Sequence, residues 1–221
     1  MKKTLILLAI LIIPSVAFLL IKSGKNEYNT PEIFGPREPV TRTENGRSVT
    51  DTVYHTVKGF SLLNEDSNLV TEQITDNKIF VADFFFTTCG TICPKMSGQL
   101  KRVQNEYKDD PSVSIVSFTV DPENDTPAIL KEYAKEYGAI SGKWHFLTGN
   151  RDQIYDLARH SYFITAMEGD GKPDAFVHSE QLVLVDKEKH IRGFYDGTDP
   201  FDVKKLIEDI KVLTLHYEGK I

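Results

Sequence analysis

One stretch of the sequence sets the fold class: Ile79-Phe-Val-Ala-Asp-Phe-Phe-Phe-Thr-Thr-Cys89-Gly-Thr-Ile-Cys93-Pro94. Its first half is apolar except for Asp83, which is typical of a central strand buried on both faces. Its second half leads into a helix, because Pro94 suits the first helical position. The stretch therefore predicts a buried strand, a loop with two cysteines and a helix. Within such a strand, Asp83 must find a hydrogen-bond partner or lose its charge.

Strand-like and helix-like segments alternate along the rest of the chain. Apolar residues recur at helical spacing from Met96 to Tyr107, and Thr126-Pro127 starts a further helix that ends before Gly138. The expected elements are a hairpin within 60–70, strands at 79–86, 113–120, 144–147, 181–185 and 191–195, and helices ending near 107, 137, 160 and 215. This order predicts an α/β fold, a thioredoxin-like mixed sheet flanked by helices, with one extra strand–helix element.

The N-terminus carries Lys2 and Lys3, followed by a nearly unbroken apolar run over residues 5–21. Because this run approaches the length of a membrane span, we expect residues 1–22 to be an uncleaved anchor, one transmembrane helix. The alternative is a signal peptide cleaved after Ser15-Val16-Ala17. The two lysines favour a cytoplasmic N-terminus, which places the rest of the chain on the outer, periplasmic or extracytoplasmic, side of the cell membrane.

Residues 23–52 are polar, contain several prolines and show no apolar periodicity. They predict a linker that keeps the following domain away from the lipid. Residues 53–221 are enough for one domain of ordinary size. The expected organisation is an anchor at 1–22, a linker at 23–52 and a thioredoxin-like domain at 53–221.

The composition narrows the classes of function. The chain has 221 residues, a net charge of −6 and a sequence pI near 5.5, so it lacks the basic surface of a nucleic-acid-binding protein. Only two cysteines are present, which rules out a disulfide-rich scaffold. A bridge between two residues so close in sequence stabilises a domain little. An exported protein with this single pair therefore uses it for chemistry.

The two cysteines are placed for joint chemistry. Cys93 is expected at a helix N-terminus, where the helix dipole and free N–H groups favour a thiolate. Cys89 precedes it by four residues, so both sulfurs share one side if the loop winds as a helical turn. The sulfurs would then converge on one metal ion or on each other. The plainer alternative is a buried pair that only packs or forms an incidental disulfide; export and the strand-to-helix position argue against it.

A third ligand is sought among the six histidines. His178 stands out because it ends the loop just before the expected strand 181–185. In a thioredoxin-like layout that loop passes beside the cysteine helix. Two sulfurs and one imidazole suit copper, and thiolates favour Cu(I) in particular. The spacing alone leaves His178 balanced between a ligand and a structural residue.

Four segments together resemble the SCO/SenC family of copper-binding assembly factors for cytochrome c oxidase. They are Phe84-Phe-Phe-Thr-Thr-Cys89-Gly-Thr-Ile-Cys93-Pro94, Val120-Asp-Pro-Glu-Asn-Asp-Thr-Pro127, Trp144-His-Phe-Leu-Thr-Gly149, and Val177-His-Ser179 followed by Leu184-Val-Asp186. The resemblance implies a thioredoxin-like fold, one N-terminal membrane anchor and copper held by Cys89, Cys93 and His178. It also implies delivery of copper to the binuclear site of oxidase subunit II, or upkeep of that site's thiols. Gly90 stands where relatives often have proline, which should loosen the loop without removing a ligand.

Two functions compete for the same thiols. The first is a copper chaperone, a binding protein rather than an enzyme, with oxidase subunit II as the partner that the resemblance implies and other copper carriers or thiol oxidoreductases as further candidates. The second is a thiol–disulfide oxidoreductase that keeps partner cysteines reduced. The spacing of Cys89 and Cys93 departs from the C-x-x-C of ordinary thioredoxins and disfavours the second. A peroxidase-like thiol enzyme is a third class that no feature requires.

Two acidic residues follow the strand 113–120. Asp121 lies at the carboxyl end of that strand, a common location for functional sites. It is a candidate for contact with a metal ligand. Asp125 and Thr126 precede the next helix, and we expect them to serve as turn and capping residues.

Overall fold

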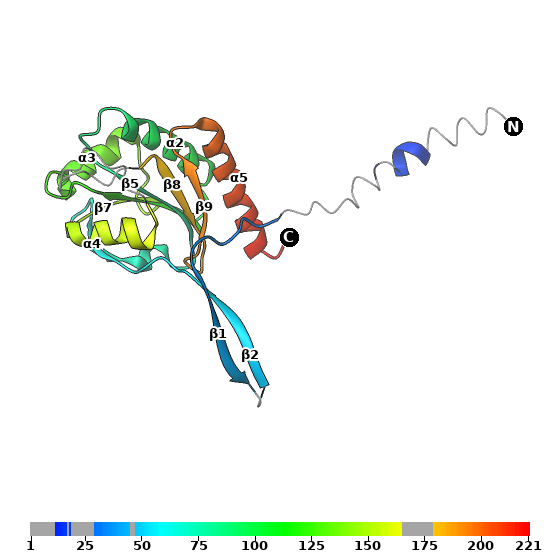
Figure 1. The fold of residues 1–221 in the computed structure, drawn as a ribbon. Helices are drawn as coiled ribbons and strands as arrows, with labels where there is room; N and C mark the ends of the chain where they lie inside the picture. Colours follow the sequence, from blue (N-terminus) through cyan, green and yellow to red (C-terminus); the bar gives the residue numbers. More distant parts are fainter. Residues whose placement is uncertain (1–11, 17, 19–28, 45–46, 165–178) are drawn as a thin grey trace, which may run out of the picture. The chain divides into compact units, whose positions relative to one another are not determined.

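A mixed seven-stranded sheet forms the centre of the protein, with strand order β4-β3-β7-β6-β5-β8-β9 (Figure 1). The computed structural model describes residues 12–16, 18, 29–44, 47–164 and 179–221. The strands are β1 (Arg37–Glu44), β2 (Arg47–Tyr54), β3 (Ser61–Asn64), β4 (Leu69–Thr71), β5 (Ile79–Phe85), β6 (Val113–Thr119), β7 (Trp144–Thr148), β8 (Gln181–Val185) and β9 (Ile191–Asp196). The α-helices are α2 (Ile92–Glu106), α3 (Pro127–Tyr137), α4 (Arg151–Asp156) and α5 (Pro200–Tyr217), with a 3-10 turn at Glu72–Thr75 and a π-helical turn at Leu157–Ser161.

Strand β5 is the central strand that the sequence predicts. All seven of its residues are buried, and it pairs in parallel with β6 and antiparallel with β8. Its side chains alternate between two cores. Val81 and Phe85 face one core, and Phe80 and Phe84 face the other. The buried apolar run is thus explained by packing on both faces of the sheet.

Helices cover both faces of this sheet, as the alternation of segments predicts. The core on one face includes buried apolar residues of α2, α3 and α5. The core on the other face includes Ile154 of α4 and Leu157 of the π-helical turn. Figure 1 shows α4 on the opposite side of the sheet from α2 and α5. The predicted layered α/β fold is therefore confirmed.

The ends of α3 and the start of α2 can be compared with the helix boundaries predicted from the sequence. Helix α3 begins as predicted: the Thr126 side chain accepts from the Ile129 N–H, and Pro127 is the first helical residue. It stops at Gly138, which has a left-handed φ of 64° that favours glycine. Helix α2 differs, because it begins at Ile92 rather than at Pro94. Pro94 still lies in the first turn, where a missing N–H breaks no helical bond.

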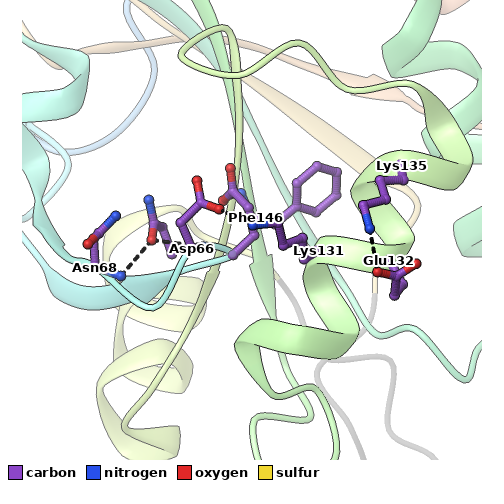
Figure 2. Close-up of polar contacts among 8 residues, drawn as sticks. Asp66, Asn68, Lys131, Glu132, Lys135 and Phe146 are labelled. Carbon is purple, nitrogen blue, oxygen red and sulfur yellow. Dashed lines mark hydrogen bonds and ion pairs between the residues drawn. The ribbon is translucent and has the colours of Figure 1, made fainter.

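The β3–β4 hairpin connects the sheet to α3 through its turn. As predicted, β3 and β4 pair antiparallel around the turn that follows Asn64. Figure 2 shows Asp66 of this turn with Lys131 of α3, whose Nζ lies 2.7 Å from the Asp66 carboxylate. Glu65 accepts the Phe146 N–H at 3.0 Å, which extends the contact of the turn to β7. The turn thus links three elements at this edge.

A second hairpin was not foreseen. Strands β1 and β2 pair along their full lengths, and the hairpin extends away from the sheet (Figure 1). It falls mostly within residues 23–52, which the sequence predicts to be a linker. The lack of apolar periodicity there did not reveal the two strands, because exposed strands need no apolar alternation. The role of this segment as a linker stays a prediction. The β-branched Thr and Val residues and the Asn45-Gly46 pair were the available signals.

The chain enters the sheet domain through a few defined contacts. Phe34 donates its N–H to the Ile191 carbonyl of β9 at 2.8 Å, and His55 donates its N–H to Pro36 at 3.1 Å across the base of the β1–β2 hairpin. Lys58 then donates its N–H to the Ser161 hydroxyl at 2.6 Å. These contacts fix the start of the domain on both sides of the hairpin.

The predicted anchor lies mainly outside the described residues. Of its 22 residues, 12–16 are helical and 18 is also helical. In the part of the chain that the structure describes, no helix has both the length and the apolar character needed to cross a membrane. The transmembrane helix therefore stays a prediction.

Candidate functional site

The two cysteines meet where β5 ends and α2 begins. The Cys89 N–H donates to the Phe86 carbonyl at 3.2 Å, which turns the chain just after the strand. Cys93 is the second residue of α2, and its N–H donates to Cys89 Sγ at 3.4 Å. The Cys89 sulfur therefore occupies the position of a helix cap, a role that the Thr91 side chain does not fill. Both cysteines are free thiols on the same side of the loop, as the spacing predicts.

The thiolate expected at Cys93 is contradicted by its surroundings, and Cys89 is the more acidic thiol. Burial raises the pKa of Cys93 to about 12, and its side chain is only 3% exposed. Burial also acts to raise the pKa of Cys89, but hydrogen bonds from the N–H groups of Cys93, Thr91 and Ile92 outweigh it and lower the pKa to about 7. The helix N-terminus thus stabilises a thiolate at Cys89 and not at Cys93. The prediction of a Cys93 thiolate was wrong because the free N–H groups at the start of α2 point back at Cys89 in the preceding loop.

The sulfurs open onto a small cavity of about 230 Å³. Its lining residues are Phe86, Thr88, Cys89, Gly90, Thr91, Ile92, Cys93 and Ser179. Ser179 comes from a distant part of the sequence and stands just before β8, where its hydroxyl accepts the Gln181 N–H at 3.2 Å. Because β8 runs antiparallel to β5, the start of β8 lies beside the end of β5. The cavity therefore joins the cysteine loop to the chain that enters β8.

His178 lies outside the described residues. Its neighbour in sequence, Ser179, lines the cavity, whereas none of the five histidines in the described part of the chain does so. The expected third ligand thus stays a prediction, and the structure brings only the two sulfurs together.

Asp125 has a different set of contacts from the one expected from the sequence. Its side chain is fully buried and accepts the Thr87 N–H at 3.0 Å together with the hydroxyls of Thr87 and Thr119. It was expected to serve as a turn or capping residue, but its carboxylate braces the loop that leads to Cys89. The available signal was that β5 and β6 are parallel neighbours, so polar residues after each strand meet at one edge.

Asp121 lies close by with a different set of contacts. Its two carboxylate oxygens accept hydrogen bonds from the Asn124 amide nitrogen, at 2.9 and 3.1 Å. The Asp121 N–H donates to the Thr119 hydroxyl. Asp121 does not line the cysteine cavity. Its contact with a metal ligand stays a prediction.

Asp83 finds the partner that its burial requires. The Ser117 hydroxyl donates to Asp83, and the Trp144 indole N–H donates to Ser117 at 2.9 Å. Burial raises the pKa of Asp83 to about 7, and the bond from Ser117 opposes that rise. The second outcome foreseen from the sequence, loss of charge, therefore applies below neutral pH.

Residues 49–215 match the family model described as SCO1/SenC. The chain belongs to the SCO1/SenC family. A curated relative from Bacillus subtilis, the SCO1 protein homolog, is 32% identical over 168 residues, which cover 75% of this chain and 86% of the relative. The resemblance of the four sequence segments is thereby confirmed.

Solved structures of the family show the same fold. BsSco, a member of the Sco family of cytochrome c oxidase assembly proteins in which a disulfide switch was identified, is 32% identical with a TM-score of 0.61, over 72% of this chain and 94% of that one. Arabidopsis thaliana ScoI, crystallised with copper bound, is 29% identical with a TM-score of 0.57, over 71% of this chain and 98% of that one. The thioredoxin-like mixed α/β Sco fold is confirmed.

Proposed function

We propose that this protein is a copper chaperone that holds copper through Cys89, Cys93 and His178 and helps to assemble the binuclear copper site of cytochrome c oxidase. The observation that carries the proposal is the pair of sulfurs on one cavity, because thiolates are the ligands that Cu(I) prefers. A copper-bound relative and a relative named as an oxidase assembly protein agree with it. Copper is the cargo here, and it leaves with the partner.

The support for His178 is its place in the chain. His178 is bonded to Ser179, which lines the cavity with both cysteines, and consecutive Cα atoms lie about 3.8 Å apart. Two sulfurs and one imidazole leave a position on the ion for a ligand of the partner, which suits handover. Subunit II of the oxidase is the proposed partner, reached from a domain held outside the cell membrane by residues 1–22.

The second candidate is thiol–disulfide exchange, and the acidity of Cys89 favours it. With a pKa near 7, Cys89 is the thiolate that would attack a partner disulfide, whose leaving sulfur departs as a thiolate. Cys93 would then lose its proton and displace the second partner sulfur. Two electrons pass to the partner, and the Cys89–Cys93 disulfide forms. This step needs no histidine.

His178→Ala separates the two functions. In the reduced full-length protein, the variant should bind copper far more weakly, while its cysteines still cycle between dithiol and disulfide. His160→Ala is the matched control, since His160 is exposed and outside the cavity. In respiring cells short of copper, His178→Ala should lose oxidase assembly as completely as Cys89→Ser does. Normal oxidase in that variant would reject chaperoning and leave thiol reduction as the function.

A further inference from the structure

We propose that Asp125 is a positioning residue for the Cys89–Cys93 pair and acts on it through Thr87. The proposal deepens the proposed function, because copper binding and thiol exchange both require two sulfurs held at one cavity. Asp125 touches neither sulfur. Its effect passes along the chain from Thr87, which precedes Cys89 by two residues.

The contacts of Asp125 fix Thr87 at two points. One carboxylate oxygen accepts the Thr87 N–H at 3.0 Å, and the other accepts the Thr87 hydroxyl. The Thr119 hydroxyl donates to the same oxygen as the Thr87 N–H. A buried carboxylate is stable only where donors surround it, and here three donors do so. The loop is therefore attached to the end of β6 as well as to its own strand.

Asp125 is itself held firmly. Its N–H donates to the Asp121 carbonyl at 2.8 Å, and the next residue, Thr126, caps the rigid helix α3. The Cys89 N–H is bonded to Phe86, so the chain is fixed on both sides of Thr87. Between this point and the start of α2, only residues 88–91 remain to adjust when the sulfurs change partners.

A fixed loop raises the effective concentration of one sulfur beside the other. We call the hydrogen bonds from Thr87 to Asp125 the brace. Without the brace, the residues before Cys89 sample more positions. Bringing both sulfurs to one ion or to each other then costs more conformational entropy. Loss of the brace should therefore weaken copper binding and disulfide formation together. Residues that orient metal ligands from outside typically change metal affinity by about 10-fold to 100-fold.

The test compares two pairs of variants of the full-length protein. Asp125→Asn removes the carboxylate charge at nearly constant shape, and Thr87→Val removes one hydroxyl bond but keeps the N–H. Thr87→Ser restores the hydroxyl and is the conservative rescue. Asp186→Asn is the control for general stability, since Asp186 is equally buried, pairs with Arg192 at 3.0 Å, and follows β8 at the opposite end of the sheet.

Two readouts are measured on each variant. The first is Cu(I) affinity in competition with a chromogenic chelator. The second is the equilibrium with glutathione, in which both thiols pass two electrons and two protons to one glutathione disulfide and give the protein disulfide and two glutathione thiols. Asp125→Asn and Thr87→Val should lower the affinity and the oxidation equilibrium constant by about tenfold each, equivalent to about 30 mV for the dithiol couple.

The controls decide the interpretation. Thr87→Ser and Asp186→Asn should stay within about twofold of the wild type in both readouts, even where Asp186→Asn melts at lower temperature. Unchanged values for Thr87→Val and Asp125→Asn would overturn the proposal, and so would an equal loss in Asp186→Asn. If Asp125→Asn does not fold, Thr87→Val decides alone. If the wild type binds no copper, the proposed chaperone function fails, and the glutathione equilibrium still tests the brace.

Discussion

The two thiols should differ greatly in reactivity, and alkylation measures the difference. The pKa of Cys89 is lowered to about 7 and that of Cys93 raised to about 12. At pH 7 roughly half of Cys89 is then thiolate, against about one part in 10⁵ of Cys93. Iodoacetamide reacts with the thiolate, so a reduced wild-type protein at pH 7 should gain one label, on Cys89.

Single-cysteine variants assign the effect to its causes. In Cys93→Ser the backbone N–H groups of residues 91–93 still reach Cys89, so its alkylation rate should titrate near pH 7, slightly higher because the Cys93 side chain contributes. In Cys89→Ser the pKa of Cys93 loses two minor raising influences and keeps burial, the largest. Its rate at pH 7 should therefore be at least ~100-fold slower and should keep rising through pH 9.

The assay is stopped-flow or mass-spectrometric alkylation of each variant between pH 5 and 10, with the urea-unfolded protein as reference. Unfolding should bring the two variants to the same rate, because the difference comes from the fold. Equal rates in the folded proteins, or faster labelling of Cys93, would show that the helix N–H groups do not act on Cys89 as described.

Three other predictions concern stability. Because burial raises the pKa of Asp83 from 3.8 to about 7, the protonated form favours folding at low pH, and that contribution is lost as the pH rises from about 4 to 7. Asp83→Asn should abolish this loss. At pH 8 its free energy of unfolding in urea titrations should exceed that of the wild type by roughly 4 kcal/mol at most. An unchanged pH dependence of the free energy of unfolding would refute this account. Gly138→Ala should cost about 1 kcal/mol, since its φ of 64° is left-handed, whereas Gly98→Ala inside α2, where a Cβ meets nothing within 4 Å, should gain about 0.5–1 kcal/mol. Changes of the same sign in both glycine variants would contradict this account. Gly90→Ala also meets nothing and should stabilise the cysteine loop by about 0.5 kcal/mol, measured by thermal unfolding, with a lowered melting point as the contrary result.

The core of the fold could be predicted because its signals are local. Apart from Asp83, residues 79–85 are apolar on both faces of one strand, and Thr126-Pro127 with Gly138 marks both ends of α3 in the sequence itself. The β1–β2 hairpin escaped for the opposite reason. The side chains at 37–43 and 48–53 are all exposed, so no burial pattern marks its strands.

The convergence of the two cysteines could be predicted from the sequence, but the difference in their acidity could not. The spacing of Cys89 and Cys93 is visible in the sequence, but which sulfur receives the N–H groups depends on the path of the loop. The Asp125 brace joins residues 38 positions apart and needs the parallel register of β5 and β6 to be known. A contact between residues so far apart in the sequence produces no periodic pattern from which it could be predicted.

The way in which the chain enters the domain has a mechanical consequence. A force applied at Pro31 loads the hydrogen bond from the Arg192 guanidinium to the Pro31 carbonyl and the bond between Phe34 and β9, and then reaches Pro36, which is hydrogen-bonded to His55. From there it passes to Lys58 and the π-helical turn at Ser161. The β1–β2 hairpin hangs outside this load path as a side branch. Its length can therefore change without altering how tension reaches the sheet, whereas the bonds at Pro31, at Phe34 and at the base of the hairpin carry the load.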